Sequence, residues 1–558
     1  MRIKKLVNSI SWLLISFLIV SLSTVFPDEK TDKVDALFAR WDTKDSPGCA
    51  LAVVQNGRII YKRGYGMANL ELGVPITPQS VFYIGSVSKQ FVAACIGLLF
   101  LQDKLNLDDD IRKYVPKIPD YETPITVQNL IHHTSGLRDY LTLLGIASID
   151  FGTYHEQDVL ELIMRQKELN FRPGDEYLYS NSGYFMLSVI VHRASGKTLR
   201  EFADEHIFKP LGMKNSRFHD DYTQLIKNRA TGYFPAGKGQ YKNFISTFDN
   251  VGSGGLFTSV EDLFFWDQNF YHHKVGGGEL YDLMHTKGTL NSGEQLDYAF
   301  AIDIGSYKGL RTVEHGGALG GYRAALTRFP DQSFSVILLA NLSSFNPSDL
   351  AHKVADIYLA DKYLKKKTEE QAQEAKTIEL PEKELKDKVG LYISMESGAS
   401  YRIRLVKGKL QFSGMGQKLN LAAASKNVFI PTGIPSSIKM EFEKPGEGKF
   451  MLLHIDQKGR PTQTYQKYER LKPSPGELEE YTGEYYSDEL ETTFRITLQK
   501  DRLRFTHRNA PAAAFTPATK DIFSVGNLRI LFSRNTGGQI DAFVVNAGRV
   551  RNLRFLKK

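Results

Sequence analysis

The last third of the chain repeats one hairpin pattern, and this repeat limits the folds that the region can adopt. Residues 401–412 align with residues 494–505 at a constant offset of 93 residues. Both copies alternate apolar and polar residues on either side of a tight turn, a pattern typical of a β-hairpin. Each copy has room for about eight short strands. We therefore expect two small all-β antiparallel barrels or sandwiches, over residues 384–472 and 477–558.

A later landmark shows where the two copies differ in length. Gly459-Arg460 in the first copy matches Gly548-Arg549 in the second at an offset of 89 residues, so the second copy has a small deletion. Neither copy carries a set of acidic and basic side chains suited to catalysis. Residues 362–383, which precede the first copy, contain runs of Lys and Glu, and we expect them to form a solvated linker.

The region before this linker, residues 30–361, mixes strand and helix patterns without a repeat. Residues 49–54 and 59–64 have the pattern of two strands joined by a turn, as do residues 324–329 and 335–341. Strands at both ends of a region, with helices between them, are typical of one sheet packed by helices. We therefore expect an α+β domain whose antiparallel sheet is flanked by helices.

The N-terminus has the pattern of a secretion signal. Three basic residues within the first five precede an apolar stretch over residues 10–20, and Ser21 and Ser23 suit the positions before a cleavage site. We expect a signal peptide over residues 1–23 and an exported protein, periplasmic or extracellular. An uncleaved anchor is the alternative, and this segment is the only expected contact with a membrane.

The composition of the chain limits the kinds of partner that we expect. The 558 residues carry a formal net charge of +8, but basic residues form few long runs, so we expect no nucleic-acid partner. The two cysteines, Cys49 and Cys95, fall on a predicted strand and on the inner face of a predicted helix. We expect two buried free thiols rather than a disulfide. The oligomeric state stays open.

The tetrapeptide Ser86-Val87-Ser88-Lys89 supplies a candidate nucleophile. It follows a buried-type run over residues 81–85 and precedes apolar residues at helical spacing. Residues i and i+3 of a helix are neighbours, with Cβ atoms about 5–6 Å apart, so Lys89 reaches the Ser86 hydroxyl. A helix N-terminus beside Ser86 also favours a developing negative charge.

Two further motifs carry polar groups suited to the same chemistry. If Tyr179-Ser180-Asn181 is extended, the side chains of Tyr179 and Asn181 lie on the same face of the chain. A phenol can transfer a proton and an amide can bind a carbonyl, so the pair suits the same chemistry. The motif His315-Gly316-Gly317-Ala318 precedes a predicted strand, and its glycines allow close backbone approach. Each motif alone is also consistent with an ordinary turn or loop.

In this order, the three motifs resemble those of the penicillin-recognising serine hydrolases: class C β-lactamases, D-alanyl-D-alanine carboxypeptidases, D-aminopeptidases and related esterases. That family carries Ser-x-x-Lys, Tyr-x-Asn, and Lys-Thr-Gly or His-x-Gly. The resemblance covers about residues 35–360, and it includes the secondary signatures His133-Thr134-Ser135-Gly136-Leu137, Pro173-Gly174 and Leu339-Ala340-Asn341. It implies a β-lactamase/transpeptidase-like domain without a cofactor. The paired repeats resemble the barrels of D-aminopeptidases, where a barrel loop limits the cleft.

The resemblance also implies a role for each residue. Ser86 would be the acylated nucleophile, with Lys89 and Tyr179 sharing the proton transfer, and the sequence leaves open which of the two is the base. A nearby Lys89 ammonium is expected to favour the Tyr179 phenolate. Asn181 would bind a substrate amide. The backbone N–H groups of Ser86 and Ala318 would form the oxyanion hole.

The third motif departs from the commoner family pattern. His315 and Gly316 stand where Lys and Thr commonly help to hold a substrate carboxylate. This form resembles D-aminopeptidases and some esterases. We count His315 as catalytic, and Gly316, Gly317 and Arg323 as substrate-binding. Arg323 would replace the missing cation, although a surface position at a strand end is a slightly better reading of that residue alone.

Two other signals are rejected. His132 and His133 have no acidic or histidine partner at ligand spacing, so we expect no metal. Residues 168–170 resemble the deacylation loop of class A β-lactamases, but Gln166 stands where the acid is expected, and we interpret the segment as an ordinary helix end.

These observations together predict an exported serine hydrolase. It would cleave a small amide, peptide or ester bond through a Ser86 acyl-enzyme, with D-amino-acid peptides from peptidoglycan among the expected substrates. The alternatives are a β-lactamase or a D-alanyl-D-alanine carboxypeptidase. From another class, the alternative is a non-catalytic sensor that binds cell-wall fragments or penicillin in the same cleft.

Overall fold

The structure is a computed structural model that describes residues 29–149, 152, 154–245, 247–363, 377–414, 417–432, 438–446, 449–508 and 512–558. The predicted signal peptide lies outside the described residues, and so does the larger part of the predicted linker. Across the described ranges, no helix is both long enough and apolar enough to cross a membrane.

A six-stranded antiparallel sheet forms the centre of the N-terminal unit, residues 29–363, in the order β10-β11-β12-β13-β1-β2. Both predicted strand pairs are in this sheet. Its strands are β1 (Cys49–Gln55), β2 (Arg58–Tyr65), β10 (Asp303–Tyr307), β11 (Leu310–Leu319), β12 (Tyr322–Phe329) and β13 (Phe334–Ala340). The first and last parts of the unit thus meet in one sheet, since β1 pairs with β13.

Both faces of this sheet are buried. Successive side chains of a strand point to opposite faces, and in β1 Ala50, Ala52 and Val54 join one apolar core while Leu51 and Val53 join another. This explains why β1 reads as an unbroken apolar run rather than an alternating one. The first core contains α2 and α6, whereas the second contains α1 and α11.

The remaining elements of the unit complete these two layers. The helices are α1 (Glu29–Phe38), α2 (Lys89–Leu101), α3 (Val127–Ile131), α4 (Tyr140–Ile146), α5 (Glu156–Met164), α6 (Asn181–Ser195), α7 (Leu199–Ala203), α8 (Lys209–Leu211), α9 (Val260–His272), α10 (Gly277–His285) and α11 (Pro347–Leu359). Three small sheets contain β3 (Met67–Asn69), β4 (Val74–Pro75), β5 (Phe82–Tyr83), β6 (Arg217–Phe218), β7 (Gly232–Gly237), β8 (Gln240–Phe244) and β9 (Leu256–Thr258). Cys49 and Cys95 are buried free thiols, as predicted.

The first repeat forms a closed eight-stranded barrel, which we call the first barrel. Helix α12 (Glu382–Lys388) leads into it. Its strands are β14 (Gly390–Ile393), β15 (Ser400–Val406), β16 (Lys409–Gly414), β17 (Gln417–Ala423), β18 (Val428–Pro431), β19 (Lys439–Glu443), β20 (Leu452–Gln457) and β21 (Arg460–Tyr468). The apolar alternation of β15 places Tyr401 and Ile403 in the barrel core.

The second repeat, the second barrel, follows α13 (Pro475–Glu479) and has nine strands in the order β25-β24-β23-β22-β30-β29-β28-β27-β26. They are β22 (Gly483–Ser487), β23 (Thr492–Gln499), β24 (Arg502–Thr506), β25 (Ala513–Ala514), β26 (Thr516–Thr519), β27 (Ile522–Val525), β28 (Leu528–Arg534), β29 (Ile540–Ala547) and β30 (Val550–Lys557). Its two edge strands are separated along the chain by Phe515 alone, so the sheet is nearly closed. The expected α+β unit followed by two barrel-like units is confirmed.

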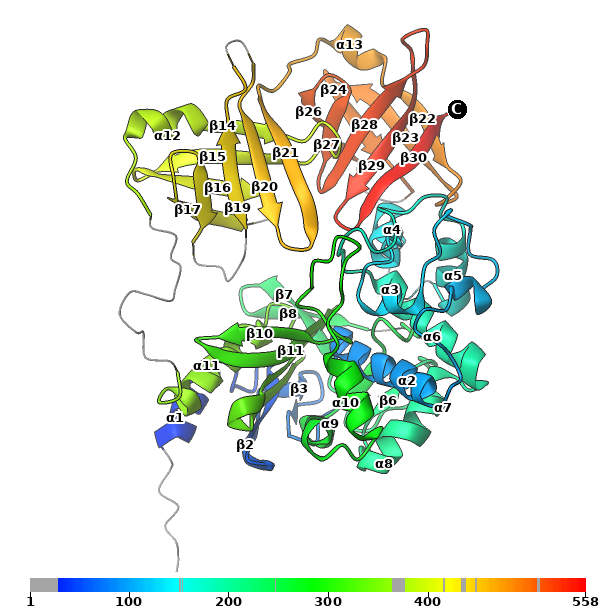
Figure 1. Ribbon diagram of the computed structural model, residues 1–558, viewed down its shortest axis with the longest axis vertical. Helices are drawn as coiled ribbons and strands as arrows, with labels where there is room; N and C mark the ends of the chain where they lie inside the picture. Colours follow the sequence, from blue (N-terminus) through cyan, green and yellow to red (C-terminus); the bar gives the residue numbers. More distant parts are fainter. Residues whose placement is uncertain are drawn as a thin grey trace, which may run out of the picture.

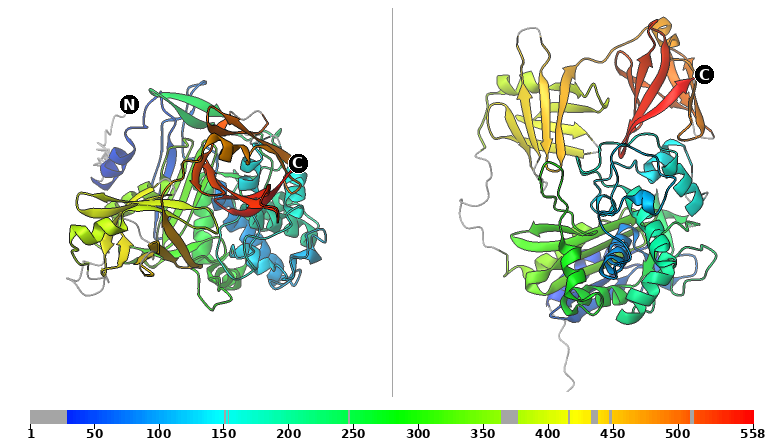
Figure 2. Two further views of the ribbon diagram at one scale, coloured as in Figure 1. Left: turned by 90° about the horizontal axis from the view of Figure 1, so that it is seen from above. Right: turned by 45° about the vertical axis from the view of Figure 1, so that its right-hand side comes forward.

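The two barrels lie side by side on one side of the N-terminal unit, as Figures 1 and 2 show from different directions. The hairpin ends of β20–β21 and β29–β30 both point toward the N-terminal unit (Figure 1). The second barrel is joined to that unit more closely, because its core residues belong to the same apolar cluster as α2 and α6. The first barrel has a separate core.

Candidate active site

The predicted nucleophile lies in a tight turn that the neighbouring sheet strand presses against. Ser86 is in the 3-10 turn Gly85–Ser88, directly before α2. Gly85 has a φ of +54°, and a Cβ there would lie 2.5 Å from the Ala318 nitrogen. A Cβ on Gly317 would lie 1.9 Å from the Ile84 oxygen. Glycine at both positions therefore lets the backbones of Ser86 and Ala318 lie against each other on one side of the site.

Lys89 is the first residue of α2, and its amine is surrounded by three oxygens. The Lys89 Nζ lies 3.0 Å from Ser86 Oγ, 3.0 Å from Asn181 Oδ1 and 2.5 Å from the Ser253 carbonyl. Two of these atoms are acceptors only, and the third belongs to a hydroxyl that also donates. A neutral amine satisfies all three, because it donates two N–H groups and receives the Ser86 hydroxyl proton on its lone pair.

Burial lowers the pKa of Lys89 well below its ordinary value, and the charge of Arg549 lowers it further while Asp139 opposes this. The side chain is fully buried. The direction of this pKa shift favours the uncharged amine, while the three surrounding oxygens can be satisfied by either protonation state of Lys89. Lys89 thus has the properties of a base that takes the proton of Ser86.

Tyr179 is a neutral phenol in this site. Burial raises its pKa well above the ordinary value, which outweighs the lowering effects of Ser86 and Arg549. The expectation that Lys89 favours the phenolate is therefore wrong, because burial dominates the pKa of Tyr179 and Lys89 is not among the groups that lower it. The buried Tyr179 hydroxyl makes no hydrogen bond of standard geometry to the described residues. Its ring packs 4.1 Å from that of His133.

Asn181 is the first residue of α6 rather than part of an extended segment, so the expected same-face arrangement does not apply. The side chain still enters the site, because Ser180 precedes the helix in an extended conformation. The Asn181 amide donates to Asp139 Oδ2 at 2.8 Å and accepts from Lys89. The backbone N–H of Asn181 also donates to Asp139 Oδ2, at 2.7 Å. Asp139 thereby fixes Asn181, and Asn181 fixes Lys89.

His315 belongs to a buried chain of hydrogen bonds that sets its protonation. Its Nδ1 lies 2.6 Å from the Gly316 carbonyl, which only accepts, so Nδ1 carries the proton. Its Nε2 lies 3.2 Å from the Tyr298 hydroxyl, which is also 3.2 Å from His133 Nε2. The Ser180 N–H donates to His133 Nδ1. Burial lowers the pKa of His315 to about 4, so the ring is uncharged at neutral pH.

Both ring nitrogens of His315 are therefore used within the protein. The ring lies beside the cavity but has no free nitrogen to exchange a proton with a substrate, and it supplies no positive charge. Its bond to the Gly316 carbonyl holds the backbone of β11, which leads directly to Ala318. A catalytic role for His315 stays a prediction, and the geometry favours an indirect one.

Arg323 lies at the start of β12, facing the same cavity. Its Nη1 donates to the carbonyls of Gly320 and Tyr322, at 3.0 and 2.6 Å. Burial lowers its pKa from the ordinary value. The Arg323 guanidinium is thus hydrogen-bonded to the turn that joins β11 to β12. It is therefore not a free surface group, and some of its donors are already used before any substrate binds.

One cavity of about 530 Å³ brings the predicted residues together. Its lining includes Ser86, Tyr179, Asn181, His315, Gly316, Gly317, Ala318 and Arg323. Lys89 lies beneath it, bonded to Ser86. Motifs more than two hundred residues apart thus meet at one point, as the resemblance implied, while the individual roles remain proposals.

The sequence analysis missed several residues of this site. Arg549, from the end of the β29–β30 hairpin, lines the cavity, and its guanidinium lies 4.6 Å from the centroid of the Tyr179 ring. Asp139, Ser253 and Tyr298 hold Asn181, Lys89 and His315. Only Arg549 had a signal: it belongs to the Gly-Arg pair that the two repeats share.

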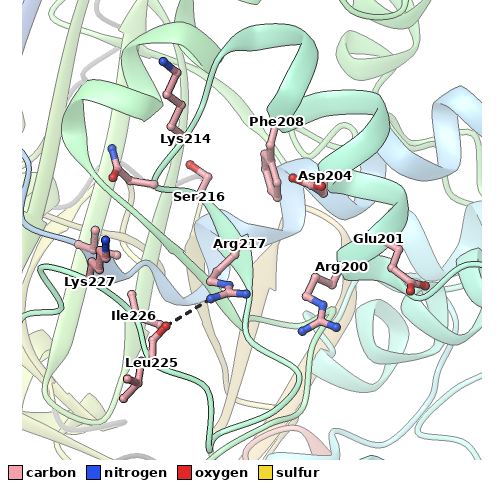
Figure 3. Close-up of a pocket in the computed structure, with 12 residues that line it drawn as sticks. Arg200, Glu201, Asp204, Phe208, Lys214, Ser216, Arg217, Leu225, Ile226 and Lys227 are labelled. Atoms are coloured by element: carbon pink, nitrogen blue, oxygen red, sulfur yellow. Dashed lines mark hydrogen bonds between the residues drawn. The ribbon is translucent and has the colours of Figure 1, made fainter.

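A second cavity of about 520 Å³ lies elsewhere in the N-terminal unit and shares no lining residue with the first. Figure 3 shows its charged side chains, with Arg217 bonded to the Leu225 carbonyl. Arg200 pairs with Asp220 at 3.1 Å. Basic and acidic groups are mixed there, and the Ser216 hydroxyl of the lining donates to Asp262 Oδ2 at 2.8 Å. Over the described part of the chain, no group of three or more His, Cys, Asp or Glu could hold a metal ion.

Comparison with known proteins places this site in a family. The Beta-lactamase family model matches residues 34–360, more than half of the chain, and the chain therefore belongs to this family. It is a serine hydrolase.

Two relatives are similar to this chain over the barrels as well as over the N-terminal unit. A D-aminopeptidase of Gluconobacter oxydans (strain 621H) is 26% identical over 548 residues, which cover 94% of this chain and 97% of the relative. A D-aminopeptidase of Brucella melitensis biotype 1 is 27% identical, over 91% of this chain and 95% of the relative. Among solved structures, a penicillin-binding protein homologue from Pyrococcus abyssi is 21% identical, with a TM-score of 0.54 over 86% of this chain and 99% of its own.

Proposed function

We propose that this protein is an exported hydrolase that cleaves a small amide, peptide or ester bond through an acyl-enzyme on Ser86. The observation that carries the proposal is the buried Lys89 amine, 3.0 Å from Ser86 Oγ and with its other two contacts to acceptor oxygens. The predicted secretion signal supports export.

Acylation follows from the protonation states. Neutral Lys89 takes the Ser86 proton as Ser86 Oγ attacks the substrate carbonyl carbon, and the backbone N–H groups of Ser86 and Ala318 stabilise the oxygen that becomes negative. The bond to the leaving group breaks as neutral Tyr179 gives that group its hydroxyl proton. The Lys89 ammonium then returns a proton to the Tyr179 oxygen, and both residues regain their starting states.

Deacylation reverses the proton transfers with water as the attacking group. Water attacks the Ser86 ester, gives one proton to the Lys89–Tyr179 pair, and releases the acid, while Ser86 recovers its own proton from that pair. The net reaction is hydrolysis of one bond by one water. His315 holds the Gly316 backbone and exchanges no proton.

The proposed substrates are small amides, peptides or esters of D-amino acids. The support is that two relatives named D-aminopeptidase match this chain over nearly all of their length, barrels included.

Labelling and turnover test the proposal together. We expect a fluorophosphonate probe to label the wild-type protein and the Ser88→Ala control, and to leave Ser86→Ala unlabelled. We also expect turnover in a panel of D-amino amides, D-alanyl-D-alanine peptides, acyl esters and a chromogenic cephalosporin. Equal labelling of Ser86→Ala would refute the acyl-enzyme, and a stable adduct without any turnover would instead support a binding sensor.

A further inference from the structure

The charges that line the Ser86 cavity have one sign. The lining includes Arg323 and Arg549 and, among the described residues, no Asp or Glu. Asp139 lies close by, but its side chain is only 1% exposed and its Oδ2 is bonded to the backbone and the amide of Asn181. Its Oδ1 accepts from Thr142. A substrate in this cavity therefore meets two guanidinium groups, while the nearby Asp139 carboxylate is buried, has both oxygens hydrogen-bonded, and lies 3.8 Å from Arg549.

Of the two arginines, Arg549 has the freer side chain. Arg323 already donates to two carbonyls. The Arg549 guanidinium has one ion pair to the described residues, a long one of 3.8 Å to Asp139 Oδ2, and no shorter hydrogen bond to them. Its side chain is 41% exposed. Most of its N–H donors are thus available on the cavity side.

The backbone around Arg549 is fixed, although its side chain is free. The Arg549 carbonyl accepts from Asn170 Nδ2 at 3.0 Å and from the Asp139 N–H at 3.3 Å. Two residues later, Arg551 donates two hydrogen bonds to Glu176, at 3.0 and 2.9 Å. The N-terminal unit therefore holds the hairpin end in place, and a substitution at position 549 leaves these backbone contacts intact.

The position of the guanidinium identifies which end of a substrate it meets. It lies over the ring of Tyr179, 4.6 Å from the centroid. In the proposed function, on which this inference rests, Tyr179 protonates the leaving group. A group beside Tyr179 and Arg549 therefore belongs to the leaving half of the substrate.

We infer that Arg549 binds a carboxylate on the leaving half of the substrate, so that the enzyme prefers peptides whose leaving residue ends in a free carboxylate. Arginine matches a carboxylate with two parallel N–H donors, a geometry that lysine lacks. The second barrel thus supplies the cation that the sheet strand lacks at His315.

The test compares D-alanyl-D-alanine with its C-terminal amide, which differ only at the carboxylate. Binding to Ser86→Ala protein, measured by calorimetry, avoids turnover and so does not depend on the acyl-enzyme. We expect the carboxylate form to bind about ten- to hundredfold more tightly, the range for a hydrogen bond to a charged group. The double variant Ser86→Ala/Arg549→Gln should lose this difference, and Arg549→Lys should restore part of it.

Arg554→Gln is the matched control, because Arg554 lies on β30, the strand that directly follows Arg549, is exposed, and does not line the cavity. It should keep the preference. Arg549→Glu should reverse the preference in favour of the amide. Equal binding of the two ligands, or an equal loss of both in Arg549→Gln, would overturn the inference.

Turnover separates this result from failure of the proposed function. Calorimetric preference without labelling or hydrolysis by wild-type protein would keep Arg549 as a carboxylate-binding residue and reject the hydrolase mechanism. Hydrolysis of both dipeptides at equal kcat/KM, with Ser86 labelled, would keep the mechanism and reject the role of Arg549.

Discussion

The two barrels offer the same hairpin end to the N-terminal unit, with different results. Gly459-Arg460 ends the β20–β21 hairpin, and the matching Gly548-Arg549 ends the β29–β30 hairpin. Gly459 accepts from the Tyr177 N–H at 3.0 Å, two residues before Tyr179. Both hairpins therefore dock beside the Tyr179 segment, but only Arg549 lines the Ser86 cavity. Of the two matching Gly-Arg pairs, only the one in the second barrel therefore contributes a side chain to this cavity.

The strength of docking also differs. The second barrel shares an apolar core with the N-terminal unit, and the buried pair Arg138–Glu489 joins them at 2.6 Å. The first barrel makes polar contacts, among them Gly459 N–H to Glu294 Oε1 at 2.7 Å and the exposed pair Lys458–Asp297 at 3.0 Å. The barrel that contributes Arg549 to the cavity is thus the one that shares its apolar core with the N-terminal unit.

The largest expected effect comes from removing the buried ion pair that joins the second barrel to the N-terminal unit. Arg138 has no exposed side-chain surface and Glu489 has 4%, so Arg138→Ala leaves a buried carboxylate unpaired. We expect a loss of about 3–5 kcal/mol in the free energy of unfolding, measured by scanning calorimetry.

Arg165→Ala is the control for this change, since Arg165 pairs with Glu491 at the same interface with 32% and 60% exposure. It should cost at most about 1 kcal/mol. Similar losses in the two variants would mean that water replaces Arg138 around Glu489, and that the second barrel is no more firmly docked than the first.

A second prediction contrasts the two matched arginines through the pH dependence of acylation. Only neutral Lys89 accepts the Ser86 proton, so the rate of Ser86 labelling falls as pH drops through the Lys89 pKa. The charge of Arg549 contributes to lowering that pKa. Arg549→Gln removes this contribution, raises the Lys89 pKa, and should move the acid limb of the labelling profile to higher pH.

Arg460→Gln should leave the acid limb in place, because Arg460 is not among the groups that act on Lys89. The second-order rate of fluorophosphonate labelling against pH measures both variants. Equal shifts of the acid limb in the two variants would show that the charges of both arginines act on the Lys89 pKa. The two hairpins would then not differ in their electrostatic effect on the site.

The smallest effect is expected at the first barrel. Glu294→Gln weakens one charge-assisted hydrogen bond to the Gly459 N–H and should cost about 0.5–1.5 kcal/mol. The cavity residues are untouched, so labelling of Ser86 should proceed at the wild-type rate. A slower rate would mean that the first barrel positions Tyr179 through Tyr177, and that both hairpins shape the site.

Local patterns predicted much of this molecule. The strands β1, β2, β12 and β13 have apolar runs between turn residues, and Ser86 and Lys89 are neighbours through helical spacing alone. The repeat predicted the barrels because alternation and turns are local signals. Each of these features depends on residues only a few positions apart.

The errors arose where distant parts of the chain meet. Residues 168–170 were interpreted as an ordinary helix end, but α5 ends at Met164, and the Asn170 side chain binds the backbone carbonyl of Arg549 and the backbone N–H of Arg551. Nothing near Asn170 in the sequence indicates this contact. The protonation of Tyr179 was missed for a similar reason, since burial by surrounding elements determines it.

The distance along the chain between Ser86 and Arg549 has a consequence for biosynthesis. More than 450 residues separate the nucleophile from the arginine that completes its cavity. At the usual rate of about 5–20 residues per second, a ribosome needs roughly half a minute or longer to cover that interval. For most of it Arg138 has no Glu489 to pair with, and until its end the Tyr179 ring has no Arg549 guanidinium above it. The charge of the substrate cavity is therefore set near the end of synthesis, long after the nucleophile has emerged.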